Sequence, residues 1–176
     1  MIKSDDLKNG PPQEFVPVTL GGKYLTFSLG REEYGVNIFQ IREIIGMRPV
    51  RPVPQTPHYV RGVISLRDKV IPVVELRLKL GMSEVEYNSY TSIVVTMENN
   101  EIGLGPVGVI VDDVSQVVNV RGTDVKPPPD LGGRPGEDFI LGVFHQGETV
   151  RTIMDFYRVL APDDFRAMAS GFFPAG

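Results

Sequence analysis

Two segments of the chain match each other along 19 positions without a gap, at a spacing of 80 residues. Residues 62–80 read GVISLRDKVIPVVELRLKL, and residues 142–160 read GVFHQGETVRTIMDFYRVL. Each segment predicts a strand, a tight turn, a second strand and a short helix. A supersecondary unit used twice is the simplest cause, so we expect an internal duplication in the fold.

The two copies share their apolar positions and differ most clearly at the turn. Arg67 in the first copy stands opposite Gly147 in the second. Because the architecture accounts for the shared positions, this difference points to a task that only the first copy performs.

The remaining segments also predict short strands. Tyr24–Leu29 alternates apolar and polar residues, which indicates a half-buried strand, and a turn at residues 30–33 leads to a second strand near Tyr34–Val36. Further strands are expected at residues 91–97 and 107–111. Gly35-Val36 is echoed by Gly108-Val109, as a duplication would require.

Two short helices are expected between the first strands and the repeat. Asn37 suits the N-cap of a helix over residues 38–45, which Gly46 would close. Thr56-Pro57 suits the start of a second helix that ends at Gly62. The proline-rich residues 48–54 between them fit either an edge strand or an extended linker.

These patterns together predict a mainly β protein with short helices, built as two small barrels related by duplication. A lone barrel of about 60 residues would be marginally stable, so we expect the two to pack together. Residues 1–19 are expected to form a flexible tail, residues 20–162 the folded domain, and residues 163–176 a short C-terminal helix or tail. Residues 126–138 are rich in proline and glycine and predict a long loop.

Composition argues against several classes of protein. The net charge of −4 is unfavourable for nucleic-acid binding, which needs a basic surface. The chain has no cysteine, which excludes disulfides and thiolate chemistry. No run of about 18 apolar residues is present to span a membrane, and the first residues lack an apolar signal core. We therefore expect a cytoplasmic protein without direct membrane insertion.

No motif supports catalysis, a metal or a cofactor. Residues 103–108, GLGPVG, satisfy the dinucleotide-binding pattern literally, but an Ile/Val-rich strand follows them in place of the required helix. Asp112-Asp113 is most simply a solvated turn, because no further acid lies at ligand spacing. His58 and His145 have no partner that the sequence identifies. An enzyme is therefore not expected.

Three blocks of the chain, taken in order, resemble the CheW family of bacterial chemotaxis coupling proteins. They are residues 27–44, 56–77 and 107–117, and the likeness runs from about Tyr24 to Leu160. The resemblance implies two SH3-like five-stranded β-barrel subdomains in pseudo-symmetric arrangement, without catalysis. It also implies an adaptor between the cytoplasmic signalling domain of a chemoreceptor and the regulatory domain of a CheA-type histidine kinase, recruited to membrane-associated receptor arrays.

The resemblance also implies partner-binding residues, because five positions match those that the family links to receptor or kinase coupling. Each position except Arg67 has an equally simple structural explanation: core packing for two of them, a helix end for the glycine, and a solvated helix face for the acid. Arg67 is the strongest candidate, since a turn needs no arginine and its planar guanidinium suits a partner carboxylate. The five residues are Ile41, Glu43, Gly62, Arg67 and Val117.

The chain departs from the family pattern at the same turn. The family's Asn-Leu-Arg-Gly is Ser65-Leu-Arg-Asp68 here, so a residue that tolerates positive φ less well replaces glycine, and Asp68 can also pair with Arg67. The loops at residues 103–106 and 127–136 are longer than is usual in the family. The alternative function is therefore a CheW-like binding module of a non-swimming chemosensory system, such as surface motility or another form of kinase regulation.

Overall fold

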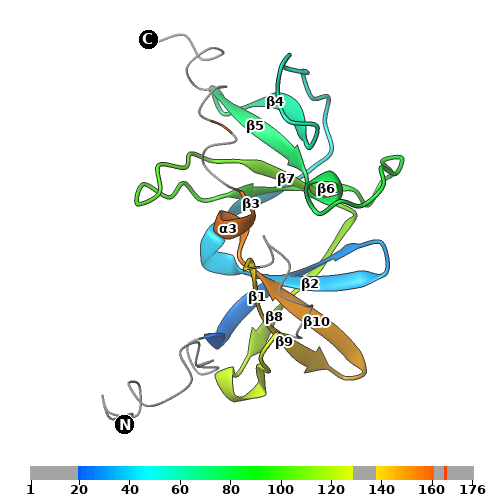
Figure 1. Cartoon of the computed structure of the whole chain (residues 1–176), viewed down its shortest axis with the longest axis vertical. Helices are drawn as coiled ribbons and strands as arrows, with labels where there is room; N and C mark the ends of the chain where they lie inside the picture. Colours follow the sequence, from blue (N-terminus) through cyan, green and yellow to red (C-terminus); the bar gives the residue numbers. More distant parts are fainter. Residues whose placement is uncertain (1–19, 129–137, 161–164, 166–176) are drawn as a thin grey trace.

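A computed structural model describes residues 20–128, 138–160 and 165, and within them the chain is mainly β (Figure 1). The strands of the first half are β1 (Gly22–Leu29), β2 (Glu32–Asn37), β3 (Ile41–Gly46), β4 (Val60–Leu66) and β5 (Lys69–Glu75). Those of the second half are β6 (Ser92–Thr96), β7 (Gly108–Val111), β8 (Asp113–Val120), β9 (Ile140–Gln146) and β10 (Thr149–Met154). The short helices are η2 (Ile38–Gln40), α2 (Leu76–Lys79), η3 (Gly122–Asp124) and α3 (Phe156–Val159).

The strands form two five-stranded sheets, which lie one above the other along the long axis of the molecule (Figure 1). The strand order of the first sheet is β8-β1-β2-β10-β9, and that of the second is β3-β6-β7-β5-β4. β3 follows β2 in sequence but lies in the second sheet, and β8 follows β7 but lies in the first. The predicted pseudo-symmetric, two-subdomain β fold is confirmed, and its halves are intertwined.

The duplication inferred from the sequence is present in the backbone. β4, β5 and α2 correspond to β9, β10 and α3, with the same order of strand, turn, strand and helix. Val73 in β5 pairs in parallel with Gly108, and Ile153 in β10 pairs in parallel with Gly35. Since residues 73 and 153 are equivalent in the repeat, the echo between the two Gly-Val pairs is also confirmed.

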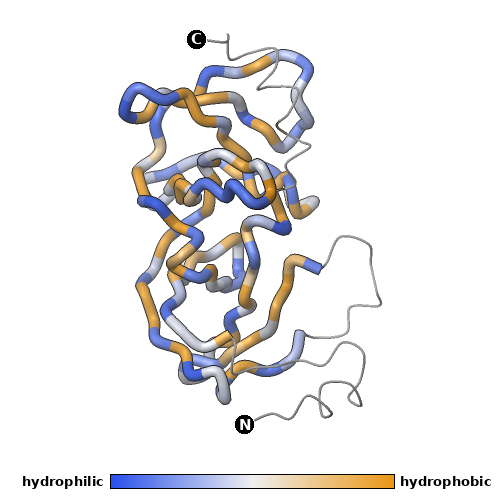
Figure 2. The backbone as a smooth tube through the Cα atoms, turned by 90° about the vertical axis from the view of Figure 1, so that its left-hand side faces the viewer, coloured by the Kyte–Doolittle hydropathy of each residue, from blue (hydrophilic) through white to orange (hydrophobic). Residues whose placement is uncertain are grey.

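The two subdomains share the largest hydrophobic cluster, and each also has a smaller cluster of its own. The shared cluster combines buried residues of the first sheet, such as Phe27, with buried residues of the second, such as Val74 and Val94. Phe27 packs against Phe156 of α3 with 5.7 Å between ring centroids. Hydrophobic stretches alternate with hydrophilic ones along most of the chain (Figure 2). Burial of shared apolar surface therefore stabilises both halves together.

The prediction of a helix over residues 38–45 is wrong. Only η2 is helical, and Ile41–Gly46 forms strand β3, paired with β6. Asn37 does act as a cap, because its side chain accepts a hydrogen bond from the amide of Phe39. Isoleucine favours strands, and pairing with β6 satisfies the backbone of this segment, so tertiary contacts override the helical spacing.

The prediction of a helix from Thr56 to Gly62 is also wrong. Residues 58–59 form a turn, and β4 begins at Val60, so Gly62 lies within a strand. Residues 48–54 are extended rather than a full strand, with a single bridge from Arg51 to Val63. The predicted tail at residues 1–19 lies outside the described residues, and the predicted loop at 126–138 and the C-terminal helix or tail at 163–176 lie largely outside them. Among those described, no helix has the length and apolar character to cross a membrane.

The turn between β4 and β5 has an unfavourable backbone. Arg67 and Asp68 both have positive φ, at 48° and 65°, which is the pattern of a type I′ hairpin turn. In the second hairpin Gly147 has a φ of 63°, and Glu148 is not among the positive-φ residues of the described chain. The first copy therefore holds two side-chain-bearing residues where glycine or asparagine is preferred.

We expect Asp68→Gly to stabilise the protein by about 0.5–1 kcal/mol, because glycine adopts positive φ without steric cost. Urea unfolding followed by circular dichroism measures the change. The matched control is Gly147→Ala in the second hairpin, where open space surrounds the glycine, so that only backbone strain should lower stability. Equal stability of Asp68→Gly and the parent chain would contradict a strained turn.

Candidate partner-binding site

Two of the five predicted site residues, Glu43 and Arg67, form an ion pair. An Nη1 hydrogen of Arg67 is donated to Oε2 of Glu43. β3 and β4 are the two edge strands of the second sheet, so this contact joins opposite edges and the sheet curls toward closure. Among the described residues, no ion pair joins Arg67 to Asp68. The expected competition from Asp68 is therefore not seen.

The ion pair borders a pocket of about 220 Å³. Apolar side chains and charged side chains both line it, and three of the four charged groups are cations. The Arg67 side chain is 74% exposed, whereas that of Glu43 is only 17% exposed. Arg67 is therefore the more accessible member of the pair. The lining residues are Arg42, Glu43, Leu66, Arg67, Lys69, Ile71, Val95 and Pro106.

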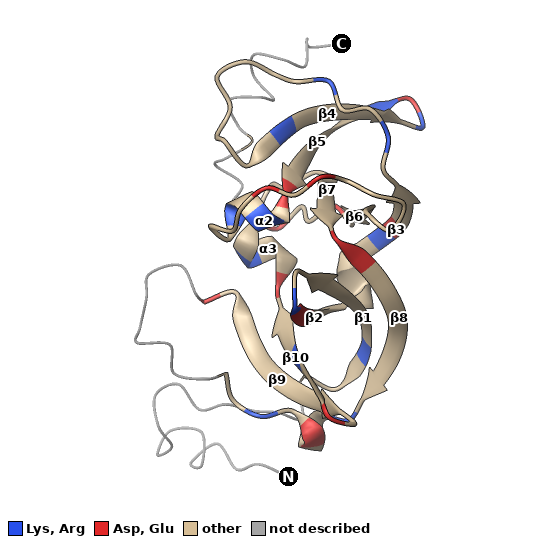
Figure 3. Cartoon of the chain, turned by 90° about the vertical axis from the view of Figure 1, so that its right-hand side faces the viewer, with Lys and Arg blue, Asp and Glu red and all other residues tan. Residues whose placement is uncertain are grey.

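Charge of both signs gathers at this end of the second sheet (Figure 3). Asp68 lies between Arg67 and Lys69 at the end of the β4–β5 hairpin. Arg42 on β3, at the opposite edge of the sheet, has its Nη2 3.6 Å from Oε1 of Glu98. Sequence analysis did not single out Arg42, which lies next to Glu43 in the sequence and lines the same pocket.

Ile41 and Val117 differ in their surroundings. Ile41 is half-buried, pairs with Thr96 and packs against the main core. Val117 lies on β8, an edge strand of the first sheet, and is 54% exposed. The structure therefore does not bring Val117 into the pocket at Arg67, since the two residues belong to different sheets.

Glycine is required at position 62 because the backbone there lies very close to the backbone of Arg51. The φ of Gly62 is +141°, and a Cβ atom there would lie 1.9 Å from the carbonyl oxygen of Arg51. The bridge between Arg51 and Val63, with both N–H···O distances at 2.9 Å, fixes this approach. The need for glycine at this position is thus explained by packing inside the subdomain.

Phe39 is an exposed residue that the sequence reasoning missed. It lies in η2, where the chain crosses from the first sheet to the second, and it is 85% exposed. Its position two residues after the Asn37 cap was the available signal, because the cap turns the chain before β3.

Both crossings between the sheets are tied by side chains. After β7, Asp112 accepts hydrogen bonds from Nε of Arg77 at 2.8 Å and from the amide of Gly30 at 2.7 Å. Burial acts to raise the pKa of Asp112, but these hydrogen bonds outweigh it and lower the pKa below its usual value. After β2, Gln40 donates to Asp155 at 2.9 Å and accepts from the amide of Phe156 at 3.0 Å. Asp112 therefore holds the crossing after β7 in place through these hydrogen bonds, whereas the sequence predicts a solvated turn there.

A buried acid, Glu75, lies at the end of β5. It is 3% exposed, and the hydroxyl of Tyr87 donates to its Oε2 at 2.6 Å. Arg61 donates from Nε to that hydroxyl at 3.2 Å and pairs with Glu84 at 2.6 Å. Burial raises the pKa of Glu75, while the Tyr87 hydrogen bond lowers it in part. Burial also contributes most to raising the pKa of Tyr87 to about 12.

A buried carboxyl group with a raised pKa is typical of acid–base sites, but the contacts around Glu75 indicate a structural role. Tyr87 and Glu84 both belong to the irregular segment between α2 and β6. The hydrogen bond from Tyr87 to Glu75 fastens that segment to β5, and the ion pair between Glu84 and Arg61 fastens it to β4. Among the described residues, no group of three or more His, Cys, Asp or Glu is arranged to hold a metal ion.

We expect Gly62→Ala to lower the free energy of unfolding by at least about 3 kcal/mol, because the new methyl group must displace the Arg51 backbone. Urea unfolding measures the loss. Gly81→Ala is the matched control: Gly81 also has positive φ, at +78°, but a Cβ atom added there would have nothing within 4 Å. Similar losses for the two variants would refute the close-approach explanation.

We expect Glu75→Gln to change how stability depends on pH. The folded pKa of Glu75 is raised, so the folded state binds more protons than the unfolded state between the ordinary pKa of about 4.5 and the folded value. The contribution of Glu75 to stability therefore falls as pH rises through this window. The parent chain should lose stability relative to Glu75→Gln over that range, as urea unfolding at several pH values would show. A constant difference would contradict the raised pKa.

Comparison with known proteins agrees with this architecture. The family model of the CheW-like domain matches residues 23–163. The chemotaxis protein CheW of Klebsiella aerogenes is 30% identical over 146 residues, which cover 83% of this chain and 86% of that protein. CheW of Rhizobium meliloti is 38% identical over 127 residues, covering 72% of this chain and 79% of that protein.

Two further matches extend the comparison. Protein FrzA of Myxococcus xanthus is 27% identical over 149 residues, covering 84% of this chain and 90% of that protein. The crystal structure of the scaffolding protein TtCheW from Thermoanaerobacter tengcongensis superimposes with a TM-score of 0.67 at 28% identity, covering 76% of this chain and 88% of that one. The sequence and the fold thus lead to the same assignment, and the chain belongs to the CheW-like domain family.

Proposed function

We propose that this protein is a non-catalytic adaptor that joins the cytoplasmic signalling domain of a chemoreceptor to the regulatory domain of a CheA-type histidine kinase. Membership of a family that includes chemotaxis proteins and a scaffolding protein supports this proposal. Such an adaptor works by geometry and by differential affinity for the states of its partners, so it needs no reacting groups.

The observation that carries the proposal is the ion pair between Glu43 and Arg67 beside an open pocket. Leu66, Ile71, Val95 and Pro106 give the pocket an apolar part, and the charged residues give it a polar rim. An apolar centre with a polar rim is the usual build of a protein–protein interface. Arg67 can offer its remaining donors to a partner carboxylate while Glu43 holds the guanidinium in place.

The other predicted residues have separate roles in this proposal. Val117, on the exposed edge of the first sheet, supplies a second surface for a second partner. Ile41 supports the strand that carries Glu43, and Gly62 supports the hairpin that carries Arg67. The protein would be cytoplasmic and recruited to receptor arrays through these contacts, and residues 1–19 and 163–176 remain predicted tails.

The alternative is a CheW-like module of a non-swimming chemosensory system. Asp68 in the hairpin turn, where the family pattern has glycine, favours this alternative, and FrzA shows that relatives of this chain include a protein that is not named as a chemotaxis protein. Co-purification with receptors and kinases from each kind of system separates the two functions. Selective capture of swimming-type partners supports the first function, and selective capture of the others supports the second.

We expect Arg67→Ala to weaken binding to the kinase domain or to the receptor fragment by at least about tenfold, which calorimetry would measure. The free energy of unfolding should change by less than about 1 kcal/mol, because the Arg67 side chain is largely exposed. Arg121→Ala, which removes an exposed arginine from the other subdomain, is the control. An unfolded Arg67→Ala variant, or undiminished binding to both partners, would overturn the assignment.

A further inference from the structure

The outer edge of β4 is only partly covered within the described chain. β4 is an edge strand of the second sheet, and Arg51 pairs with it at Val63. Residues 48–50 then line a pocket beside the strand in place of continuing the ladder. The pocket has a volume of about 420 Å³ and shares no lining residue with the pocket at Arg67.

The register of β4 shows which backbone groups face outward. Both backbone groups of Val63 bond to Arg51, on the side away from β5. Hydrogen-bonded pairs alternate along an antiparallel ladder, so Ser65, two residues on, also directs its N–H and C=O away from β5. Such an unpaired edge is a template for an added strand.

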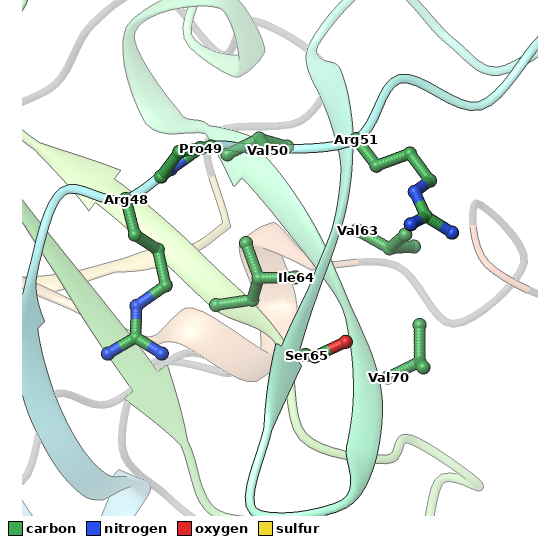
Figure 4. A pocket seen from close by; sticks show the side chains of 8 residues that line it. All are labelled: Arg48, Pro49, Val50, Arg51, Val63, Ile64, Ser65 and Val70. Atoms are coloured by element: carbon green, nitrogen blue, oxygen red, sulfur yellow. The ribbon is translucent and has the colours of Figure 1, made fainter.

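Two arginines flank this edge on opposite faces. Figure 4 shows Arg48 on the same side as Ile64, and Arg51 on the same side as Val63, Ser65 and Val70. Among the described residues, neither Arg48 nor Arg51 takes part in an ion pair. The edge therefore presents two available cations, one on each face of any strand that pairs with it.

Charge complementarity defines the segment that fits. Successive side chains of an extended strand point to opposite faces, so two adjacent acidic residues place one carboxylate on each side. Two acids separated by one residue would both lie on the same face. Val70 is 42% exposed and offers an apolar contact next to the cation on its face.

We propose that the β4 edge at Ser65 binds an extended segment of a partner protein that carries two adjacent acidic residues, one held by Arg48 and the other by Arg51. The backbone of this segment pairs with the N–H and C=O of Ser65. This site is additional to the proposed adaptor surfaces, and it does not depend on the ion pair between Glu43 and Arg67.

Fluorescence anisotropy with short dye-labelled peptides tests the proposal. The probe Thr-Val-Asp-Glu-Val-Thr carries adjacent acids, and the control Thr-Asp-Val-Glu-Val-Thr has the same composition with both acids on one face. We expect the probe to bind at least about threefold more tightly than the control, since one exposed ion pair separates them. Equal affinity of the two peptides would overturn the proposed arrangement.

Variants of the protein locate the binding edge. Arg48→Ala and Arg51→Ala should each weaken probe binding about two- to fivefold, whereas Arg121→Ala should leave it unchanged. Ser65→Pro should abolish binding, because it removes an outward N–H while leaving the β4–β5 hydrogen bonds. Circular dichroism checks that this variant is folded. If it is not, the two arginine variants decide the outcome on their own.

A different occupant of the β4 edge would give different binding results. Self-association of the chain that Arg48→Ala and Arg51→Ala abolish would show that a second copy occupies the edge, and would overturn the proposal. Probe binding that survives both arginine substitutions would also overturn it. Arg67→Ala should leave probe binding intact, so failure of the adaptor proposal and failure of this one are distinguishable.

Discussion

The two halves of the molecule exchange strands, and this exchange holds the two sheets together. β3 completes the second sheet although it follows β2, and β8 completes the first although it follows β7. Side-chain hydrogen bonds of Gln40 and Asp112 hold the two crossings in place. Because the subdomains also share a core, they cannot separate without losing sheet pairing and apolar burial together. Surfaces on the two subdomains are thereby held in a fixed relation, as an adaptor requires.

The same exchange places the candidate site. β3 brings Glu43 to one edge of the second sheet, and the β4–β5 hairpin brings Arg67 to it from the other. The hairpin turn has positive φ at two residues that carry side chains, and the second copy has glycine at the position of Arg67. Strain of this kind persists where the surrounding structure determines the conformation, and it is common at binding sites. The strained backbone of this turn is consistent with the binding role that we propose for Arg67.

Much of the fold could be predicted because the duplication repeats a local pattern. Strand, turn, strand and helix were correct in both copies, since alternation and turn residues act over short distances. The segment 38–45 was not, because isoleucines at 38, 41 and 45 fit a helix while pairing with a distant strand decides the outcome. A backbone reason for glycine at position 62 was expected, but its cause is a close approach of two backbones rather than a helix end. The contact between Glu43 and Arg67 depends on closure of the sheet, which no local pattern encodes.

We propose that the protein holds a receptor and a kinase at the same time. Sedimentation velocity of the protein, a receptor signalling fragment and the kinase regulatory domain, alone, in pairs and all together, tests this proposal. We expect one species in the full mixture that sediments faster than either binary complex and contains all three chains. Displacement of the kinase domain by the receptor fragment, with only binary complexes at every ratio, would contradict it.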